Sequence, residues 1–156
     1  NISRTEAKQL IDNYFKEFSG IKKFMDEQVN FARDNGYVQT ILGRKRWLRD
    51  ITSNNATVRS FAERNAINAP IQGTSADIIK LGMIDVWNEL SKYFENGTLK
   101  MQLQIHDELV FEVKDEVADE LGLKIKSIME NVLEKRDIKN VPLVVSLDVG
   151  DTLGQI

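Results

Sequence analysis

The chain has 156 residues, of which 42% are hydrophobic, enough for one domain with a genuine core. It contains no cysteine, which excludes disulfides and thiolate metal sites and favours a reducing compartment. It shows no secretory leader pattern and no apolar run of membrane-spanning length. We therefore expect a soluble intracellular protein and, because the chain opens without Met, an excised fragment or processed product.

The net charge of -3 hides an uneven distribution of charge. Residues 1–80 contain 13 Lys or Arg and 9 Asp or Glu, a net +4, whereas residues 81–156 contain 8 and 15, a net -7. The segment 44–64 is the most basic, with six basic and two acidic residues. This asymmetry fits a protein that binds a polyanion with one part and cations with another, although solvated surface charge accounts for the counts equally well.

Patterns in the first part of the chain predict two helices and then a β-hairpin, over residues 4–18, 21–34 and 37–48. Ser3 and Glu6 form a capping-box pattern at the start of the first helix. Helical spacing predicts an apolar stripe on the first helix and a buried side of the second, which consist of Leu10, Ile11, Tyr14, Phe15 and Phe18, and of Ile21, Phe24, Met25, Gln28, Val29 and Ala32. Gly36 is expected to end the second helix in a left-handed conformation, and Gly43 to turn the hairpin.

The rest of the chain predicts an α+β lobe around a small antiparallel sheet. Helical patterns flank Pro70, which is expected to interrupt the helix because proline cannot donate the helical hydrogen bond. The predicted elements are helices over 56–68, 75–93 and 116–133, and strands over 99–105, 109–113 and 141–150. Alternation predicts that the apolar side of the first of these strands consists of Leu99, Met101, Leu103 and Ile105.

In the stretch QIHDELVFEV, residues 104–113, only His106 and Asp107 separate the two strands, so a two-residue turn is expected, with Glu108 beside it. Adjacent carboxylates repel each other, so the pair costs stability unless a cation lies nearby. Mg²⁺ suits the position, because one or two carboxylates together with substrate phosphates commonly bind it. Ordinary polar turn residues and a surface histidine account for the same pattern.

A second polar pattern lies between residues 62 and 80, where Arg64, Asn68 and Gln72 recur every four residues. On a helix this spacing forms one polar ridge. Long donors of these types match the minor-groove acceptors that every base pair presents. A solvated helix face is the other interpretation.

Three segments resemble DNA polymerases of family A, the bacterial DNA polymerase I type. QIHDELVFEV resembles the motif C hairpin, and AERNAINAPIQGTSADIIKLGMI, residues 62–84, resembles the helix pair that precedes it. GYVQTILGRKRWLRDI, residues 36–51, is similar to the hairpin that follows the fingers helices. The segments occur in the family's order, and the resemblance runs from residue 1 to about residue 150.

The resemblance implies a role for each matching residue. Asp107 matches the catalytic carboxylate that helps bind two Mg²⁺ ions, Glu108 a supporting carboxylate at the metal site, and His106 a histidine that approaches the primer terminus. The residues implied to contact DNA are Arg64, Asn68 and Gln72 in the minor groove, Arg44, Lys45 and Arg46 near the template backbone, and Arg59, which is basic in the family.

The resemblance also implies a function and an architecture. The chain is expected to be the carboxy-terminal portion of a template-directed DNA polymerase, with part of a right-hand palm and adjoining fingers helices. Residues 1–156 form one lobe in this interpretation, with 1–36 from the fingers and 37–156 from the palm. The partners implied are primer-template DNA and deoxynucleoside triphosphates, and the location is cytoplasmic, at the bacterial nucleoid.

The sequence departs from the family pattern in three ways. It shows neither the second metal-binding aspartate nor the nucleotide-binding fingers helix, and it ends in GDTLGQI where the family has Asn-Trp and a final Ala-His. We therefore expect the chain alone to be inactive and to need the missing amino-terminal polymerase segments. Surfaces that those segments cover are expected to favour self-association.

Other functions remain open at this point. A non-catalytic duplex-DNA-binding or scaffolding module that keeps the polymerase fold would need no metal at Asp107. A single-subunit RNA polymerase shares the fold but typically has serine where this chain has Glu108. One piece of a split polymerase fits the sequence as well as a truncation does.

Overall fold

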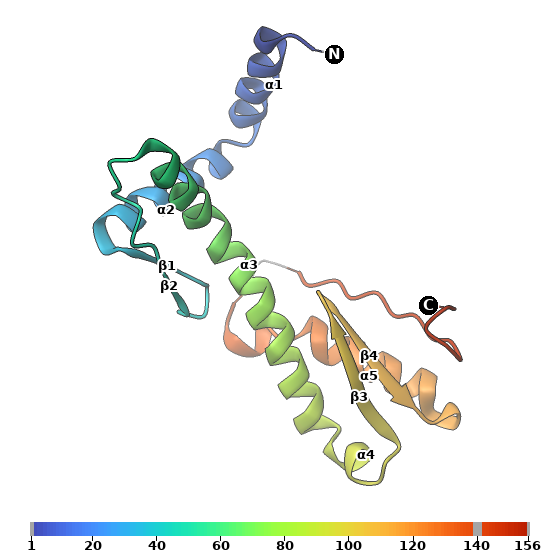
Figure 1. Ribbon diagram of the computed structural model, residues 1–156. Coiled ribbons are helices and arrows are strands. Elements are labelled where there is room, and N and C mark those ends of the chain that lie inside the picture. Colours follow the sequence, from blue (N-terminus) through green and yellow to red (C-terminus); the bar gives the residue numbers. More distant parts are fainter. Residues whose placement is uncertain (1, 139–141, 156) are drawn as a thin grey trace. The chain divides into compact units, whose positions relative to one another are not determined.

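The computed structural model describes residues 2–138 and 142–155 (Figure 1). The chain forms two compact units, Asn1–Thr74 and Ser75–Ile156. Within the described residues each unit contains helices and a two-stranded antiparallel sheet, which confirms the predicted α+β class. The predicted division into fingers helices over 1–36 and a palm portion over 37–156 stays a prediction, because compactness does not assign parts of a larger enzyme.

The first unit opens with two helices, α1 (Arg4–Glu17) and α2 (Ser19–Asn35). The capping box is confirmed: the Glu6 N–H donates to Ser3 Oγ (3.2 Å) and the Ser3 N–H donates to Glu6 Oε2 (2.8 Å). This backbone hydrogen bond from Ser3 lowers the pKa of the Glu6 carboxyl. Helix α2 ends at Gly36, whose φ of 77° is the predicted left-handed cap.

The apolar residues of these two helices differ in burial. On α2, Ala32 is buried in the core of the unit, whereas Ile21, predicted to be buried, is exposed. On α1 the predicted stripe is half-buried at Phe15 and otherwise exposed, at Leu10, Ile11, Tyr14 and Phe18. Helical spacing predicted which residues share a side of a helix, but not what covers that side.

A short hairpin packs one face into the core of the first unit. Strand β1 (Tyr37–Gln39) pairs antiparallel with β2 (Lys45–Trp47), and Gly43, with a φ of 83°, allows the turn between them. Val38, at the centre of β1, is fully buried. The core around it consists of Ala32, Leu48, Ile51, Ala62, Ala66 and Ala69, with Val29 packed against it.

Helix α3 (Ala56–Glu89) continues through Pro70, so the prediction that this proline interrupts the helix is wrong. A proline inside a helix costs about 3 kcal/mol. Here Pro70 and Ala66 are both buried, and burial of apolar surface offsets that cost. The Thr74 hydroxyl also ties this turn to the hairpin, since it donates to the Pro70 carbonyl (2.6 Å) and accepts from the Ile41 N–H (3.1 Å).

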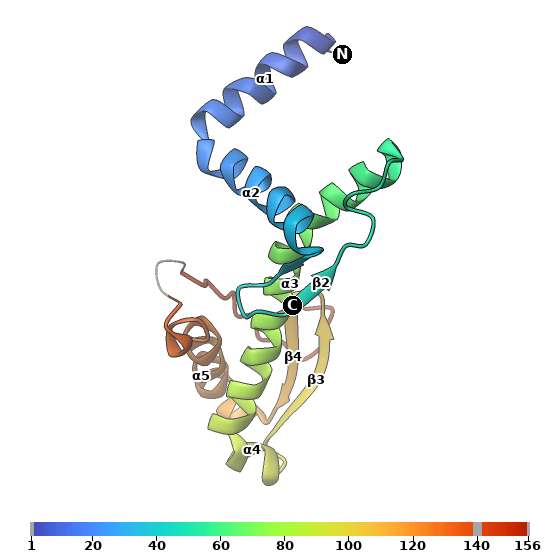
Figure 2. The same ribbon diagram turned by 90° about the vertical axis from the view of Figure 1, so that its left-hand side faces the viewer.

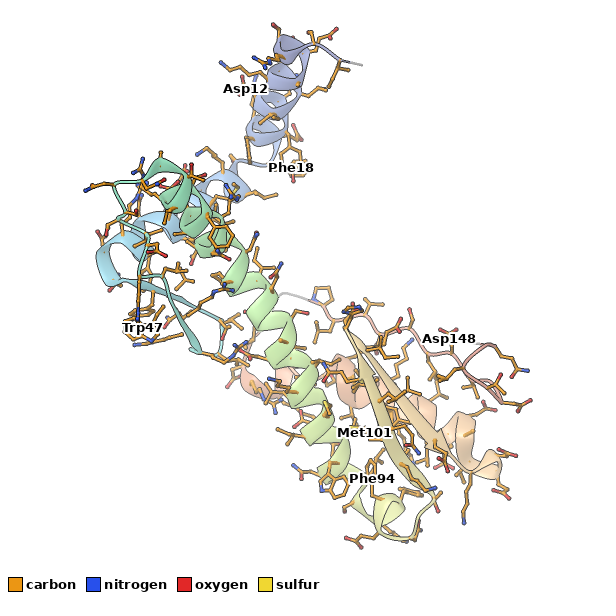
Figure 3. The ribbon with its side chains drawn as sticks, viewed as in Figure 1. Asp12, Phe18, Trp47, Phe94, Met101 and Asp148 are labelled. Atoms are coloured by element: carbon orange, nitrogen blue, oxygen red, sulfur yellow. The ribbon has the colours of Figure 1, made fainter. Side chains whose placement is uncertain are left out.

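The second unit contains the end of α3, a second hairpin and helix α5 (Ala118–Glu130), which lies beside the hairpin (Figure 2). Strands β3 (Leu99–Ile105) and β4 (Glu108–Val113) pair antiparallel. Their shared core with the helices consists of Val86, Leu90, Leu99, Leu121, Ile125 and Ile128. Figure 3 labels two residues that pack against this core, Phe94 and Met101.

Shorter helices complete this unit. The predicted helix over 75–93 is divided, because α3 ends at Glu89 and α4 (Ser91–Glu95) follows after Leu90. Single 3-10 turns flank α5, at Asp115–Val117 (η1) and Glu134–Arg136 (η2). Of the helices in the described ranges, none is long and apolar enough to cross a membrane.

The predicted final strand over 141–150 is wrong for residues 142–150, which form no strand, and Val141 lies outside the described residues. A strand requires a hydrogen-bonding neighbour along its backbone. In this segment the Val145 N–H instead donates to Glu130 Oε1 on α5 (3.1 Å). Leu147 packs against Gly122, where an added Cβ would lie 3.2 Å from its Cδ1 and Cδ2 atoms. The segment is therefore held by side-chain contacts with α5.

We predict that Gly73→Ala destabilises the protein. A Cβ at this position of α3 would lie 2.6 Å from Thr40 Cγ2 and 3.2 Å from Arg44 Nη2. Overpacking costs about 1–3 kcal/mol and the gain in helix propensity is about 1 kcal/mol, so we expect a net loss of about 1 kcal/mol in chemical denaturation. Gly20→Ala is the control, because nothing lies within 4 Å of its added Cβ, and it should not destabilise. Equal effects of both changes would contradict the close approach.

A second prediction concerns Asp85, which accepts from Arg136 Nη1 (2.8 Å) and Nη2 (2.9 Å) in a pair that is largely shielded from solvent. The hydrogen bond from Arg136 lowers the pKa of the Asp85 carboxyl. The pair therefore stabilises the fold above the carboxyl's unfolded pKa of about 3.9, and its contribution disappears as the pH falls through the lower folded pKa.

We expect Asp85→Asn to lower the free energy of unfolding by about 1–2 kcal/mol at pH 7. The difference from the unsubstituted chain should shrink when the pH is lowered from 5 towards 2. Glu120→Gln breaks an exposed pair with Lys124 and serves as the control, with a loss of at most about 0.5 kcal/mol. A difference for Asp85→Asn that does not depend on pH would refute the ion pair as its cause.

Candidate active site and nucleic-acid interface

The β3–β4 hairpin closes with the two-residue turn that the sequence predicts. Ile105 lies opposite Glu108, so His106 and Asp107 form the turn. His106 has a φ of 54°, a left-handed conformation that turns of this length require at one or both central residues. The Gln104 side-chain amide donates to the His106 carbonyl oxygen (3.2 Å) and braces the turn.

A β-bulge at Gln102 changes which residues of β3 share a face. Met101 lies opposite Phe111, but Leu103 lies opposite Val110, so Gln102 is the extra residue. Beyond the bulge the alternation is reversed, and Leu103 and Ile105 are about half exposed. The predicted apolar side is therefore correct at Leu99 and Met101 and wrong at Leu103 and Ile105.

The acidic residues of the hairpin have different surroundings. Glu112 accepts from Lys100 Nζ and Gln102 Nε2, each at 2.6 Å, and the Lys100 hydrogen bond lowers the pKa of its carboxyl. By contrast, the side chains of Asp107 and Glu108 are exposed and make neither a hydrogen bond nor an ion pair with residues 2–138 or 142–155. Two adjacent negative charges at the hairpin tip are thus left without a protein partner in the described chain.

The two tip carboxylates fit part of a Mg²⁺ site. Hard cations of this kind bind oxygen ligands and are often held by one or two carboxylates together with substrate phosphates. No group of three or more His, Cys, Asp or Glu side chains that could hold a metal occurs among the described residues. Asp107 and Glu108 are therefore suited to a site completed by substrate and by carboxylates from elsewhere.

The polar ridge of the first unit lies on α3. Because the helix continues through Pro70, Arg64, Asn68 and Gln72 lie on one side of it, and all three are exposed. Arg64 Nη1 donates to Ser60 Oγ (2.9 Å). The side-chain amides of Asn68 and Gln72 make no hydrogen bond within the described residues. The ridge presents donors to solvent.

The basic residues near the β1–β2 hairpin also hold the first unit together, which sequence patterns did not reveal. Arg44 Nη2 donates to the Gly73 carbonyl (3.0 Å) and Arg46 Nη2 to Asn65 Oδ1 (3.2 Å), so both join the hairpin to α3. Arg59 Nη1 donates to the Ser53 carbonyl (2.7 Å) in the segment before the helix. Lys45 Nζ lies 4.2 Å from the centre of the Tyr37 ring.

Trp47 is an exposed residue to which the sequence analysis gave no role beyond its place in the predicted hairpin. Its exposed fraction is 66%, and it projects from the β1–β2 hairpin (Figure 3). The sequence shows an aromatic residue next to Lys45 and Arg46, but only the structure shows that this ring is exposed, as rings on binding surfaces are.

Comparisons with known proteins agree with the resemblance. The model of the family described as DNA polymerase family A matches residues 1–155. The chain is 47% identical over 153 residues to DNA polymerase I of Streptococcus pneumoniae and 45% identical over 152 residues to that of Bacillus caldotenax. Each match covers 97% of this chain, but only 16% and 17% of the respective relative.

A solved structure is similar as well. The POL domain of Pol1 from M. smegmatis, in complex with DNA primer-template and dNTP, matches with a TM-score of 0.82 and 41% sequence identity. The match covers 94% of this chain and 25% of that one. The chain thus spans about a sixth of the length of the curated relatives. Because the family model matches residues 1–155 and these relatives share both sequence and fold with it, the chain belongs to DNA polymerase family A.

Proposed function

We propose that the chain is the carboxy-terminal portion of a template-directed DNA polymerase that adds deoxynucleotides to a primer 3′ end. The observation that carries the proposal is the pair of unpartnered carboxylates at the β3–β4 tip, in a chain that belongs to this family. The relatives are named DNA polymerase I, and the M. smegmatis structure contains primer-template and dNTP. We extend those substrates to this chain.

Asp107 and Glu108 would hold Mg²⁺ at the reaction centre. When bound, two such ions stabilise the attacking primer 3′ oxygen and the leaving pyrophosphate oxygen. The two-residue turn fixes the backbone of both residues relative to the strands, and a bound cation would order their exposed side chains. A further carboxylate and the nucleotide-binding fingers helix would come from other parts of the polymerase.

The α3 ridge would align the primer-template. The distance from Arg64 to Gln72 is eight residues of helix, about 12 Å, and base pairs are about 3.4 Å apart, so the ridge spans roughly three to four base pairs. Donors on Arg64, Asn68 and Gln72 reach acceptors that are the same for all base pairs in the minor groove. This arrangement checks base-pair shape without reading sequence, and alignment of the terminus favours in-line attack.

The basic residues of the first unit would supply attraction for the template backbone. Arg46 keeps its charge while it donates to the Asn65 side-chain oxygen, because a neutral acceptor does not neutralise a guanidinium. The Arg59 guanidinium also lies 4.0 Å from the Glu63 carboxylate, which offsets part of its charge. Arg46 therefore serves both the local fold and the positive potential.

The test is Asp107→Ala in the polymerase that carries this chain. We expect primer extension in Mg²⁺ to fall at least about 100-fold, because stabilisation by the metal is worth several kcal/mol, while affinity for primer-template is largely kept. Asp115→Ala, an exposed acid of η1 in the same unit, is the matched control and should extend normally. Extension that survives Asp107→Ala would favour the alternative of a non-catalytic duplex-binding module.

Two substitutions of His106 distinguish the energetic cost of its left-handed backbone conformation from a role of its imidazole in primer extension. A residue other than glycine at positive φ costs about 1–2 kcal/mol, which glycine does not incur. His106→Gly should therefore be more stable than His106→Ala by about 1 kcal/mol in denaturant unfolding. Both variants lack the imidazole, so their primer-extension rates should fall together. A more active glycine variant would show that turn geometry, and not the ring, is what extension requires.

A further inference from the structure

The outer face of the β1–β2 hairpin combines aromatic and basic side chains. Strand alternation places Val38 and Arg46 on the face that packs against α3. The opposite face carries Tyr37, Lys45 and Trp47. One face of this short hairpin therefore serves the core, and the other presents aromatic rings to solvent.

The aromatic rings on this outer face form a continuous line. Tyr37 and Trp47 are opposite each other across the strands, with ring centres 5.2 Å apart. Phe31 of α2 continues the line, 5.5 Å from Tyr37. The edge-on contact of Trp47 with Tyr37, at 60°, leaves the indole 66% exposed. Much of the largest ring on this face is available to a ligand.

Positive charge surrounds this line of rings. The segment 37–50 contains four basic residues and one acidic residue, a net +3. Lys45 Nζ lies over the Tyr37 ring, and Arg49 follows the hairpin as an exposed side chain. Basic side chains interleaved with exposed aromatic rings are the pattern of surfaces that bind single-stranded nucleic acid, where bases stack on the rings and phosphates meet the charges.

We propose that Trp47, supported by Tyr37, is a stacking platform for an unpaired base of the template strand. The proposal rests on the proposed function, which supplies a template with unpaired bases ahead of the primer terminus. The ligand is single-stranded because the faces of paired bases are covered by their neighbours in a duplex. Charge complementarity selects a polyanion over an apolar protein surface.

A purely structural role for Trp47 makes a different prediction. Cross-strand aromatic pairs stabilise a hairpin, and that role requires only the contact with Tyr37. Loss of hairpin stability would weaken binding of every DNA equally. A stacking platform affects only DNA that has unpaired bases.

The experiment measures the Kd of the complete polymerase for primer-templates with a blunt end or with an eight-nucleotide 5′ template overhang, by fluorescence anisotropy. We expect Trp47→Ala to reduce the affinity gained from the overhang about 5- to 150-fold and to leave blunt-duplex binding unchanged. Trp47→Phe keeps a ring and should retain most of the gain. Trp87→Ala removes the chain's other exposed indole, on α3, and should have no effect on the gain.

A second readout reports the contact directly. A 2-aminopurine base in the overhang should be quenched by the enzyme, more weakly by Trp47→Ala and nearly normally by Trp47→Phe. An unchanged overhang gain in Trp47→Ala, or equal loss for blunt and overhanging DNA in both Trp47 variants, would overturn the platform.

The same preparations separate this proposal from the proposed function. Asp107→Ala should lose extension but keep the overhang gain and the quenching. If Asp107→Ala still extends primers, the catalytic assignment fails while the platform stands. If Asp107→Ala is inactive and Trp47→Ala keeps the gain, the platform fails alone.

Discussion

Electrostatic repulsion between two neighbouring carboxylates is the constraint on which the rest of the site depends. Asp107 and Glu108 are adjacent at the tip of the β3–β4 hairpin, and no described side chain neutralises them. In the proposed function a bound cation offsets this repulsion. The satisfied carboxylate of Glu112, a few residues along the same strand, shows that the hairpin could have neutralised its acids.

Helix α3 contributes residues to the cores of both units. Its first part supplies buried alanines to the core around Val38 and the exposed donors of the ridge. Its last part supplies Val86 to the core beneath β3. Continuity through Pro70 is what keeps Arg64, Asn68 and Gln72 in helical register, since a break there would separate Gln72 from the other two.

Sequence patterns correctly predicted the features whose conformation is determined by neighbouring residues in the chain. The capping box, the left-handed Gly36 and the two-residue turn each depend on a few adjacent residues, and each is confirmed. The wrong predictions concern elements whose structure depends on contacts with residues far away in the sequence. Burial overrides the helix-breaking tendency of Pro70, and the absence of a partner strand among the described residues leaves 142–150 unpaired. The roles of the site residues stay predictions. Three of these residues, His106, Asp107 and Glu108, lie at the tip of the hairpin, where the sequence pattern placed them.

The bulge at Gln102 shows how a change of one residue in strand length affects which side chains of this hairpin face inward. Each strand of a hairpin alternates its faces, so a single inserted or deleted codon between Leu99 and Val113 would exchange inside for outside up to the tip. Amino-acid replacements leave that parity intact. The division of this hairpin into an inner and an outer face therefore depends more on the length of its strands than on the exact residue type at most positions.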